Sequence, residues 1–311
     1  MQIALTGGTG FIGSYIAKAL SDSNHNVTIL ARNSNKVPNL KTLKGVSIVA
    51  CPLEDKHMFA THLKGCEILI HVAVGFRETE TEILQHDTLP SIALFEAAAK
   101  AGVKKIIYTS STSVVDYLYM TANGKYEYAG KTIDENHCPM PTTPYGAAKA
   151  ANEQYLQSFS YTYPVQIAIV RPGYIFGNPV VDGAYPQPDT HFATIAKQAL
   201  NGEDIIVEKN GGTQFLWAGY LTEVYKKLLS ENHNREVFYA LGANYFSWAD
   251  IATIAVEALN SKSKIIITDN HESIEPYLFS VEKMKNKLNL HFTENRKKLS
   301  EHFVYLANTG K

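Results

Sequence analysis

The stretch Thr6-Gly7-Gly8-Thr9-Gly10-Phe11-Ile12-Gly13 decides the fold, because it follows a short apolar run at residues 2–5 and precedes an apolar pattern of helical spacing. Glycine at a strand-to-helix junction permits a tight turn, lets backbone N–H groups approach a pyrophosphate, and lets the helix pack on the strand. The start of the helix adds partial positive charge for phosphates. We therefore expect a dinucleotide to contact Gly7, Gly10, Phe11, Ile12 and Gly13.

Outward from this turn, short β-branched runs alternate with helical patterns. Expected strands occupy residues 2–5, 27–31, 46–50, 67–72, 106–109 and 166–170, and expected helices occupy residues 11–20, 58–63, 88–101 and 145–159. Strands separated by helices imply βαβ units and a parallel sheet covered on both faces. Because such crossovers are right-handed, we expect an α/β fold with a doubly wound parallel sheet of the Rossmann type. That context favours a dinucleotide-binding turn over a glycine-rich loop that binds nothing.

The pattern changes near residue 173, where prolines at positions 179, 186 and 188 mark an irregular connection. Beyond it we expect helices over residues 192–201 and 248–260 and a strand over residues 264–268. The expected division is an NAD(P)-binding domain over residues 1–172, joined by strand or helix segments within 211–242, and a smaller mixed lobe over 173–311 that mainly binds substrate.

Composition narrows the function further. The 311 residues include 29 basic and 30 acidic side chains, so no basic excess is available for binding nucleic acid or an anionic membrane. No segment approaches the ~20 apolar residues of a membrane span. The three cysteines form no C-x-x-C pair, and the 11 histidines lack the spacing of metal ligands. We expect a cytoplasmic protein with a small-molecule substrate, no metal, no nucleic acid and no membrane partner.

The end of the second expected strand, Ala31-Arg32-Asn33, bears on the choice of cofactor. A carboxylate there would accept hydrogen bonds from the ribose of NAD, whereas an arginine accommodates the 2′-phosphate of NADP. This stretch has no acid, and Lys36 follows it. The Arg32 guanidinium can bind a phosphate through two N–H groups, although an exposed surface arginine is the alternative. We expect NADP in preference to NAD.

A tyrosine and a lysine supply the candidate acid–base pair. Of the 18 tyrosines, Tyr145 alone has a lysine four residues later, Lys149, which puts both side chains on one helical face. A free phenol has a pKa near ~10, so catalysis at neutral pH requires a lower pKa, which a neighbouring ammonium would provide. Ser110-Ser111-Thr112-Ser113 follow another expected strand, at the sheet edge where open α/β folds bind ligands. A serine hydroxyl there can hold a substrate oxygen.

Together these residues resemble the short-chain dehydrogenase/reductase superfamily, in its extended branch of nucleotide-sugar epimerases and dehydratases. The resemblance covers nearly the whole chain, including residues 6–13, 71–73, 110–111, 145–149 and 171–177. It implies that Ser111 is the active serine, Tyr145 the acid–base and Lys149 its partner. The expected cofactor contacts then extend to Leu53, Ala73, Thr109, Tyr145 and Lys149, and the expected substrate contacts are Thr112, Ser113, Tyr174 and Trp217. The family commonly dimerises through two helices per subunit, so we expect a homodimer through residues 88–101 and 145–159.

The chain departs from the family's pattern at positions that bear on the substrate. Pro52 stands where an acid often holds adenine, and Tyr174 stands where the sugar-nucleotide branch often has asparagine. The stretch Phe215–Tyr220 lacks the arginine that this branch uses for a diphosphate, although buried phosphate charge must be paired. The resemblance nevertheless makes a nucleotide sugar the first expected substrate class.

Three functions remain open. The first is an NAD(P)-dependent epimerase or dehydratase that acts by hydride transfer at a carbinol or ketone centre; elimination is the least favoured reaction, because no acidic pair adjoins Ser111. The second is an NADPH-dependent reductase of a non-sugar carbonyl compound. The third is a dinucleotide-binding regulator without turnover, which would be expected to lack the serine, the tyrosine or the lysine.

Overall fold

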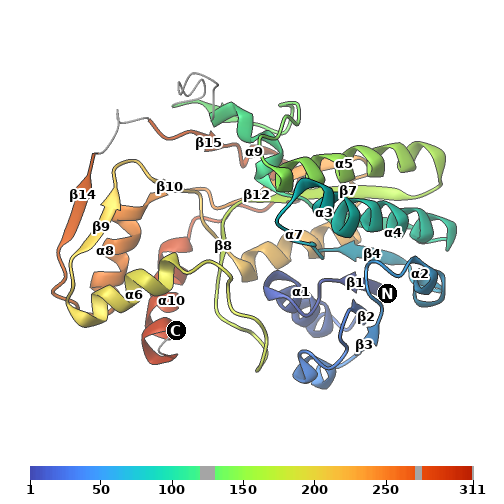
Figure 1. Cartoon of the computed structure of the whole chain (residues 1–311), viewed down its shortest axis with the longest axis horizontal. Helices are drawn as coiled ribbons and strands as arrows, with labels where there is room; N and C mark the ends of the chain where they lie inside the picture. The colour runs from blue at the N-terminus through green and yellow to red at the C-terminus, as the bar shows by residue number, and fades with distance from the viewer. Residues whose placement is uncertain (120–129, 270–274, 310–311) are drawn as a thin grey trace.

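A seven-stranded parallel sheet organises the larger part of the molecule (Figure 1). The computed structural model describes residues 1–119, 130–269 and 275–309. In spatial order, the strands are β12 (Glu236–Ala240), β7 (Gln166–Pro172), β5 (Lys105–Thr109), β4 (Ile68–His71), β1 (Gln2–Thr6), β2 (Asn26–Ala31) and β3 (Val46–Ala50). The strand order reverses between β1 and β4, and such a reversal is where open α/β sheets bind ligands. The predicted doubly wound fold is confirmed.

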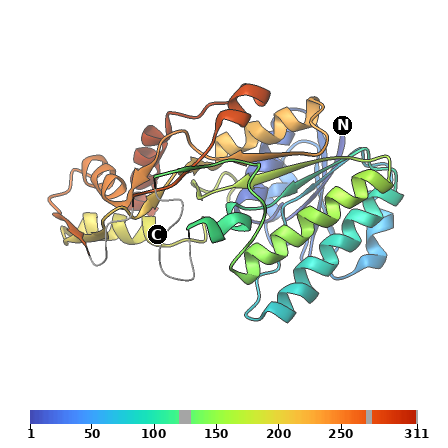
Figure 2. The ribbon, with the colours of Figure 1, turned by 90° about the horizontal axis from the view of Figure 1, so that it is seen from above.

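Helices cover both faces of this sheet because its strands are apolar on both sides. Ile3 and Leu5 of β1 face a core shared with α1 (Phe11–Asp22) and α7 (Ala218–Ser230), whereas Ala4 faces the opposite core. That opposite core is covered by α2 (Lys56–Leu63), α4 (Leu89–Lys100) and α5 (Pro144–Thr162). Figure 2 shows α4 and α5 lying side by side. The alternation along β1 thus places one helical layer on each side.

A smaller lobe with its own core stands beside the sheet, on the left in Figure 1. It consists mainly of α6 (His191–Asn201), β9 (Ile205–Glu208), α8 (Trp248–Ala258), β14 (Ile265–Thr268) and α10 (Asn295–Thr309), with β9 and β14 pairing in parallel. Phe192, Phe215 and Phe303 are buried in this core. The remaining helical segments are η1 (Pro38–Thr42), α3 (Glu80–Ile83), η2 (Leu84–Thr88), η3 (Thr112–Tyr119) and α9 (Glu282–Leu288). Within the three described ranges, no helix is long and apolar enough to cross a membrane.

The short strands and one helix start differ from the sequence expectation. Six strands are two residues long: β6 (Thr132–Ile133), β8 (Ile175–Phe176), β10 (Gly212–Thr213), β11 (Leu216–Trp217), β13 (Phe246–Ser247) and β15 (Leu278–Phe279). Two residues carry no alternation, so the sequence pattern cannot reveal them. The expected helix at residues 88–101 is preceded by α3 and by the π-helical turn η2, which begin at a capping box of Thr79 and Glu82.

Candidate functional site

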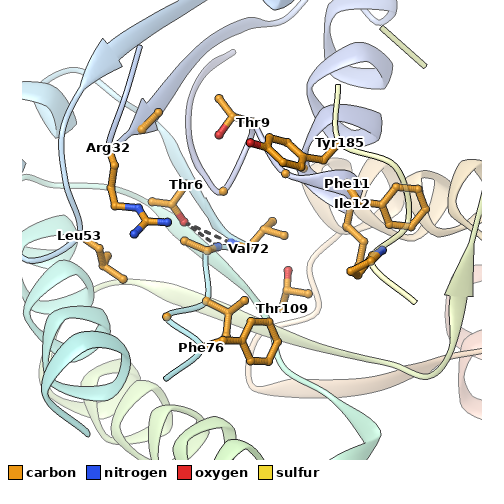
Figure 3. A pocket seen from close by; sticks show the side chains of 18 of the residues that line it. Thr6, Thr9, Phe11, Ile12, Arg32, Leu53, Val72, Phe76, Thr109 and Tyr185 are labelled. Carbon is orange, nitrogen blue, oxygen red and sulfur yellow. Dashed lines mark hydrogen bonds between the residues drawn. The ribbon is translucent and has the colours of Figure 1, made fainter. Parts of the chain in front are cut away.

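A cavity of about 750 Å³ opens at the carboxyl edge of the large sheet. Its lining residues follow β1, β2, β3, β4, β5 and β7, and further lining comes from α1, α5 and the loop 178–190. Figure 3 shows Arg32 and Leu53 together on one side of the cavity and Phe76 beside Thr109 on another. We call the region of Arg32, Lys36 and Leu53 the β2 end, and the region of Phe76, Ser110 and Tyr145 the α5 end.

The glycine turn lies between these two ends and leaves no room for side chains. Gly7 has a φ of +71°, and an added Cβ there would lie 2.6 Å from the Ala73 nitrogen. An added Cβ on Gly13 would lie 2.0 Å from the Gly7 carbonyl oxygen, so α1 packs directly against the end of β1. Gly10 caps α1 without a side-chain bond, and the first turn holds no acid. The turn therefore fits a pyrophosphate, which needs exposed backbone N–H groups and positive dipole charge.

Positive charge gathers at the β2 end. Arg32 follows the last residue of β2 and lines the cavity; within the described residues it makes no ion pair. The ammonium of Lys36 lies 4.1 Å from the ring centroid of Tyr185, which stands on the loop 178–190. Leu53 supplies apolar wall beside Arg32 (Figure 3). This end can hold an anionic group next to an apolar, planar one.

A buried chain of hydrogen bonds fixes the loop after β4 against the glycine turn. The Thr6 hydroxyl accepts from two backbone N–H groups of that loop at 3.2 and 3.3 Å and lies 2.6 Å from Nδ1 of His71. Nε2 of His71 lies 2.9 Å from the Ser91 hydroxyl, which itself donates to the Asp87 carbonyl. Nε2 is therefore the donor and Nδ1 the acceptor. Burial lowers the pKa of His71 to about 3, which keeps the ring neutral.

The structure brings Ser111, Tyr145 and Lys149 to the α5 end of the cavity. The buried Lys149 ammonium donates to the Thr109 carbonyl at 3.0 Å and lies 5.8 Å from the ring centroid of Tyr145. The Ser111 hydroxyl hydrogen-bonds the Tyr145 phenol and also pairs with the hydroxyl of Ser113 at 3.2 Å. A phenol, a hydroxyl and an ammonium thus share one wall of the cavity.

The electrostatics of this group differ from the expectation. Burial raises the pKa of Tyr145; the hydrogen bond from Ser111 opposes this rise, and the Asp87 carboxylate adds to it. Burial also lowers the pKa of Lys149, against the attraction of Asp87 and Glu153. Lys149 does not lower the pKa of Tyr145 below its ordinary value, because the Lys149 ammonium donates to the Thr109 carbonyl and not to the phenol. The phenol therefore keeps its proton at neutral pH and can act as an acid.

Two residues beside this group were missed by sequence reasoning. Asp87 is 1% exposed, stands in the π-helical turn η2, and accepts a 2.6 Å hydrogen bond from the Gly75 nitrogen. Phe76 follows Gly75 and stacks on Tyr145, with ring centroids 5.3 Å apart and an interplanar angle of 25°. Neither residue belongs to a periodic pattern, so only the spatial approach of the loop after β4 reveals them.

The four residues expected to bind substrate lie elsewhere: Thr112, Ser113, Tyr174 and Trp217 are not among the described residues that line the cavity. Tyr174 packs edge-on against Phe215, with ring centroids 4.8 Å apart. Trp217 packs against Tyr15, with ring centroids 6.3 Å apart, and lies under the Lys298 ammonium. The expected cofactor contacts all line the cavity: Gly7, Gly10, Phe11, Ile12, Gly13, Arg32, Leu53, Ala73, Thr109, Tyr145 and Lys149. The hydroxyl of Thr109, however, is paired with Tyr225 at 2.6 Å.

Known proteins are similar to this chain in sequence or in fold. A model of the protein family described as "NAD dependent epimerase/dehydratase family" matches residues 3–238. A putative UDP-glucose 4-epimerase of Methanocaldococcus jannaschii is 30% identical over 185 residues, which cover 57% of this chain and 56% of that protein, so the match spans little more than half of the relative. Cinnamoyl-CoA reductase 2 of Arabidopsis thaliana is 23% identical over 99% of this chain and 93% of its own. The crystal structure of UDP-glucuronic acid 4-epimerase from Bacillus cereus in complex with NAD superposes with a TM-score of 0.81 at 18% identity, over 100% of both chains, which shows a shared fold.

Proposed function

Because this chain belongs to the NAD dependent epimerase/dehydratase family, we propose that it is an oxidoreductase that transfers hydride between a nicotinamide cofactor and a carbinol or carbonyl carbon, with Tyr145 as the acid–base. One observation carries the proposal: the glycine turn and the group Ser111, Tyr145 and Lys149 line the same cavity. The bound nicotinamide supplies the hydride chemistry. The side chains of this chain supply the proton and hold the reacting oxygen.

In the direction of reduction, Tyr145 donates its proton to the substrate oxygen. Burial raises the pKa of this phenol, so the acid is present at neutral pH. Ser111 holds the same oxygen through its hydroxyl, and the ammonium of Lys149 stabilises the phenolate left after the transfer. The Thr109 carbonyl fixes that ammonium at 3.0 Å, which keeps it beside the ring of Tyr145.

The cofactor we propose is NADP, in preference to NAD. The β2 end offers the guanidinium of Arg32 and the ammonium of Lys36, and Ala31, the last residue of β2, is followed directly by the arginine with no carboxylate. A guanidinium binds a phosphate through two N–H groups, whereas a ribose hydroxyl pair calls for an acceptor at this point. Arg32 and Lys36 would then hold the 2′-phosphate.

Two substrate classes are candidates. A nucleotide sugar, turned over by epimerisation, is supported by the relatives and solved structures named for UDP-sugars. A non-sugar carbonyl compound, reduced by NADPH, is supported by the positive charge at the β2 end and by the pairing of Arg77 with Glu54 and of Lys149 with the Thr109 carbonyl among the described residues at the α5 end. We place the second class first, because the diphosphate of a nucleotide sugar needs paired charge wherever it is buried.

Replacement of Tyr145 tests the proposed function. We expect Tyr145→Phe to lower turnover by about 100-fold or more, since general acid–base catalysis contributes about that much, while NADPH binding followed by fluorescence stays near the wild-type value. Tyr161→Phe is the matched control, because Tyr161 also lies on α5 but is 74% exposed and outside the cavity. Unchanged turnover in Tyr145→Phe would remove the proposed role.

A further inference from the structure

The loop 178–190 leads into the smaller lobe but packs against the core of the large sheet. Val181 contacts the core that contains β1 and α1, and Ala184 is buried in it. Between them the chain turns sharply: the Ala184 nitrogen donates to the Val181 carbonyl at 2.9 Å, and Gly183 has a φ of +77°. Tyr185 follows directly, so a buried neighbour fixes the point from which its side chain projects.

Hydrogen bonds tie the same loop to three other elements. The Tyr15 hydroxyl on α1 donates to the Asn178 carbonyl oxygen at 2.5 Å, and the Asn178 side-chain oxygen lies 2.5 Å from Nδ1 of His302 on α10. The side-chain amide of Asn39, in η1, donates to the Asp182 carbonyl oxygen at 3.0 Å. Because η1 connects β2 with β3, the loop is fastened to the segment that also carries the β2 end of the cavity.

The side chain of Lys36 meets this loop at the ring of Tyr185. The Lys36 ammonium lies 4.1 Å from the ring centroid, and both residues line the cavity, where Figure 3 shows Tyr185. Lys36 precedes Val37, which is buried in the same core as Ala184. Each partner of the contact thus stands next to a buried residue, so the fold determines where both side chains begin.

The contact leaves the positive charge of Lys36 available to a ligand. Within the described residues, Lys36 forms no ion pair with a carboxylate, and the same holds for Arg32. An aromatic ring attracts a cation through its electron-rich face without neutralising it. An ammonium has three N–H donors, so those that point away from the ring can bind an anion.

A lysine that is already held binds an anion at a lower entropic cost. A lysine side chain that is free in solvent loses much of its rotamer freedom when it binds a phosphate. A side chain that rests on a ring has less of this freedom left to lose, so more of the attraction appears as affinity. The ring of Tyr185 therefore favours a ligand that places a phosphate beside Lys36.

We infer that Tyr185 is a positioning residue for the cofactor: its ring holds the Lys36 ammonium where, together with Arg32, it binds the 2′-phosphate of NADP. The inference rests on the proposed function, which supplies the nicotinamide cofactor. NAD has no 2′-phosphate, so its affinity does not depend on the contact between Lys36 and Tyr185. A loop that leads into the smaller lobe thus contributes to the choice between the two cofactors.

The test measures the Kd of the whole chain for NADPH and for NADH by fluorescence titration. We expect Tyr185→Leu to weaken NADPH binding about 2- to 5-fold, the effect of one cation–π contact at an exposed site, and to leave NADH binding unchanged. Tyr185→Phe keeps the ring face and should bind NADPH as the wild type does. Tyr161→Leu is the matched control, because Arg235 lies 3.6 Å from the ring centroid of Tyr161, which does not line the cavity.

A double-mutant cycle distinguishes positioning from direct contact. Lys36→Met alone should weaken NADPH binding about 10-fold, the loss of one hydrogen bond between charged groups. If Tyr185 acts through the ammonium, Tyr185→Leu should cause no further loss in the Lys36→Met chain. Displacement of NADPH by 2′,5′-ADP and by 5′-AMP isolates the phosphate, since only the first should bind less well in each variant.

The outcomes separate this inference from the proposed function. Equal losses for NADPH and NADH in Tyr185→Leu, full additivity with Lys36→Met, or an equal loss in Tyr185→Phe would overturn the inference and leave the proposed reaction intact. If Tyr185→Leu lowers the thermal unfolding midpoint, Lys36→Met and Tyr185→Phe decide: equal weakening of both cofactors in Lys36→Met overturns the inference. Full turnover in Tyr145→Phe removes only the proposed acid–base role, whereas an absence of NADPH binding overturns both.

Discussion

The two ends of the cavity are built by different means. The β2 end is formed by residues that follow β2 and β3, beside the turn after β1, and it is positively charged. The α5 end is formed partly by the loop after β4, with the aromatic ring of Phe76, and among the described residues that line it the cations Arg77 and Lys149 are paired with Glu54 and with the Thr109 carbonyl. The β2 end, which would bind the cofactor, thus depends on the geometry of the sheet. The α5 end, which would select the substrate, depends on loops, which tolerate changes of sequence.

The largest effect should come from closing the glycine turn. Gly13→Ala places a Cβ 2.0 Å from the Gly7 carbonyl oxygen, so α1 must move away from β1. We expect the affinity for NADPH to fall at least about 10-fold, because a displaced helix start loses hydrogen bonds to the charged pyrophosphate, which contribute about 1.5–3 kcal/mol each. Fluorescence titration with NADPH measures this, and the thermal unfolding midpoint is the control for loss of fold. Unchanged affinity would show that the turn does not set the position of the cofactor.

A smaller effect should distinguish the two nicotinamide cofactors. In Arg32→Asp, the guanidinium at the β2 end is replaced by a carboxylate that repels a 2′-phosphate and accepts from ribose hydroxyls. Hydrogen bonds to charged groups contribute about 1.5–3 kcal/mol, so we expect NADPH affinity to fall about 10- to 100-fold while NADH affinity holds or rises. Arg296→Asp, at an exposed arginine on α10 away from the cavity, is the control. Equal losses for both cofactors would contradict the NADP preference.

An effect on stability, and not on ligand binding, is expected in acid at the start of the loop 178–190. Buried His302 on α10 lies 2.5 Å from the Asn178 side-chain oxygen, where this loop begins, and burial lowers its pKa to about 4. A depressed histidine pKa means that its stabilisation is complete above the unfolded value of about 6.5 and is lost as pH falls toward 4, at about 1.4 kcal/mol per pH unit. In His302→Gln, the free energy of unfolding should fall less steeply as the pH is lowered from about 6.5 to about 4, by the same slope of about 1.4 kcal/mol per pH unit. Replacement of the exposed His57 by Gln should not change this dependence. Denaturant unfolding at several pH values measures both, and parallel curves for wild type and His302→Gln would rule the effect out.

Sequence reasoning reached the parts of the molecule that have a period or a fixed spacing. The strands around the glycine turn and the tyrosine–lysine pair were visible because each depends on residues close in the chain. Phe76 and Asp87 were invisible, because their approach to Tyr145 depends on how the loop after β4 folds over η2. The direction of the tyrosine pKa was also out of reach, since burial, which no spacing records, outweighs the nearby lysine.

The substrate residues illustrate the same limit. Tyr174 and Trp217 occur at positions that the family pattern connects with substrate, yet both pack into aromatic clusters away from the cavity wall. The loop 178–190 does line the cavity, but its sequence has no regular pattern, and its prolines indicate only an irregular connection. The homodimer expected from the helices now seen as α4 and α5 stays a prediction.

The chain between Tyr185 and Gln187 connects two parts of the cavity wall. The Lys36 ammonium lies over the ring of Tyr185, Gln187 also lines the cavity, and the single residue between Tyr185 and Gln187 is Pro186, with a second proline directly after Gln187. Proline fixes its own φ and restricts the residue before it, so the backbone from Tyr185 to Pro188 has few accessible conformations. A ligand that displaces Tyr185 from Lys36 would therefore also shift Gln187, so that occupancy of the β2 end and the shape of the cavity wall at Gln187 would be coupled.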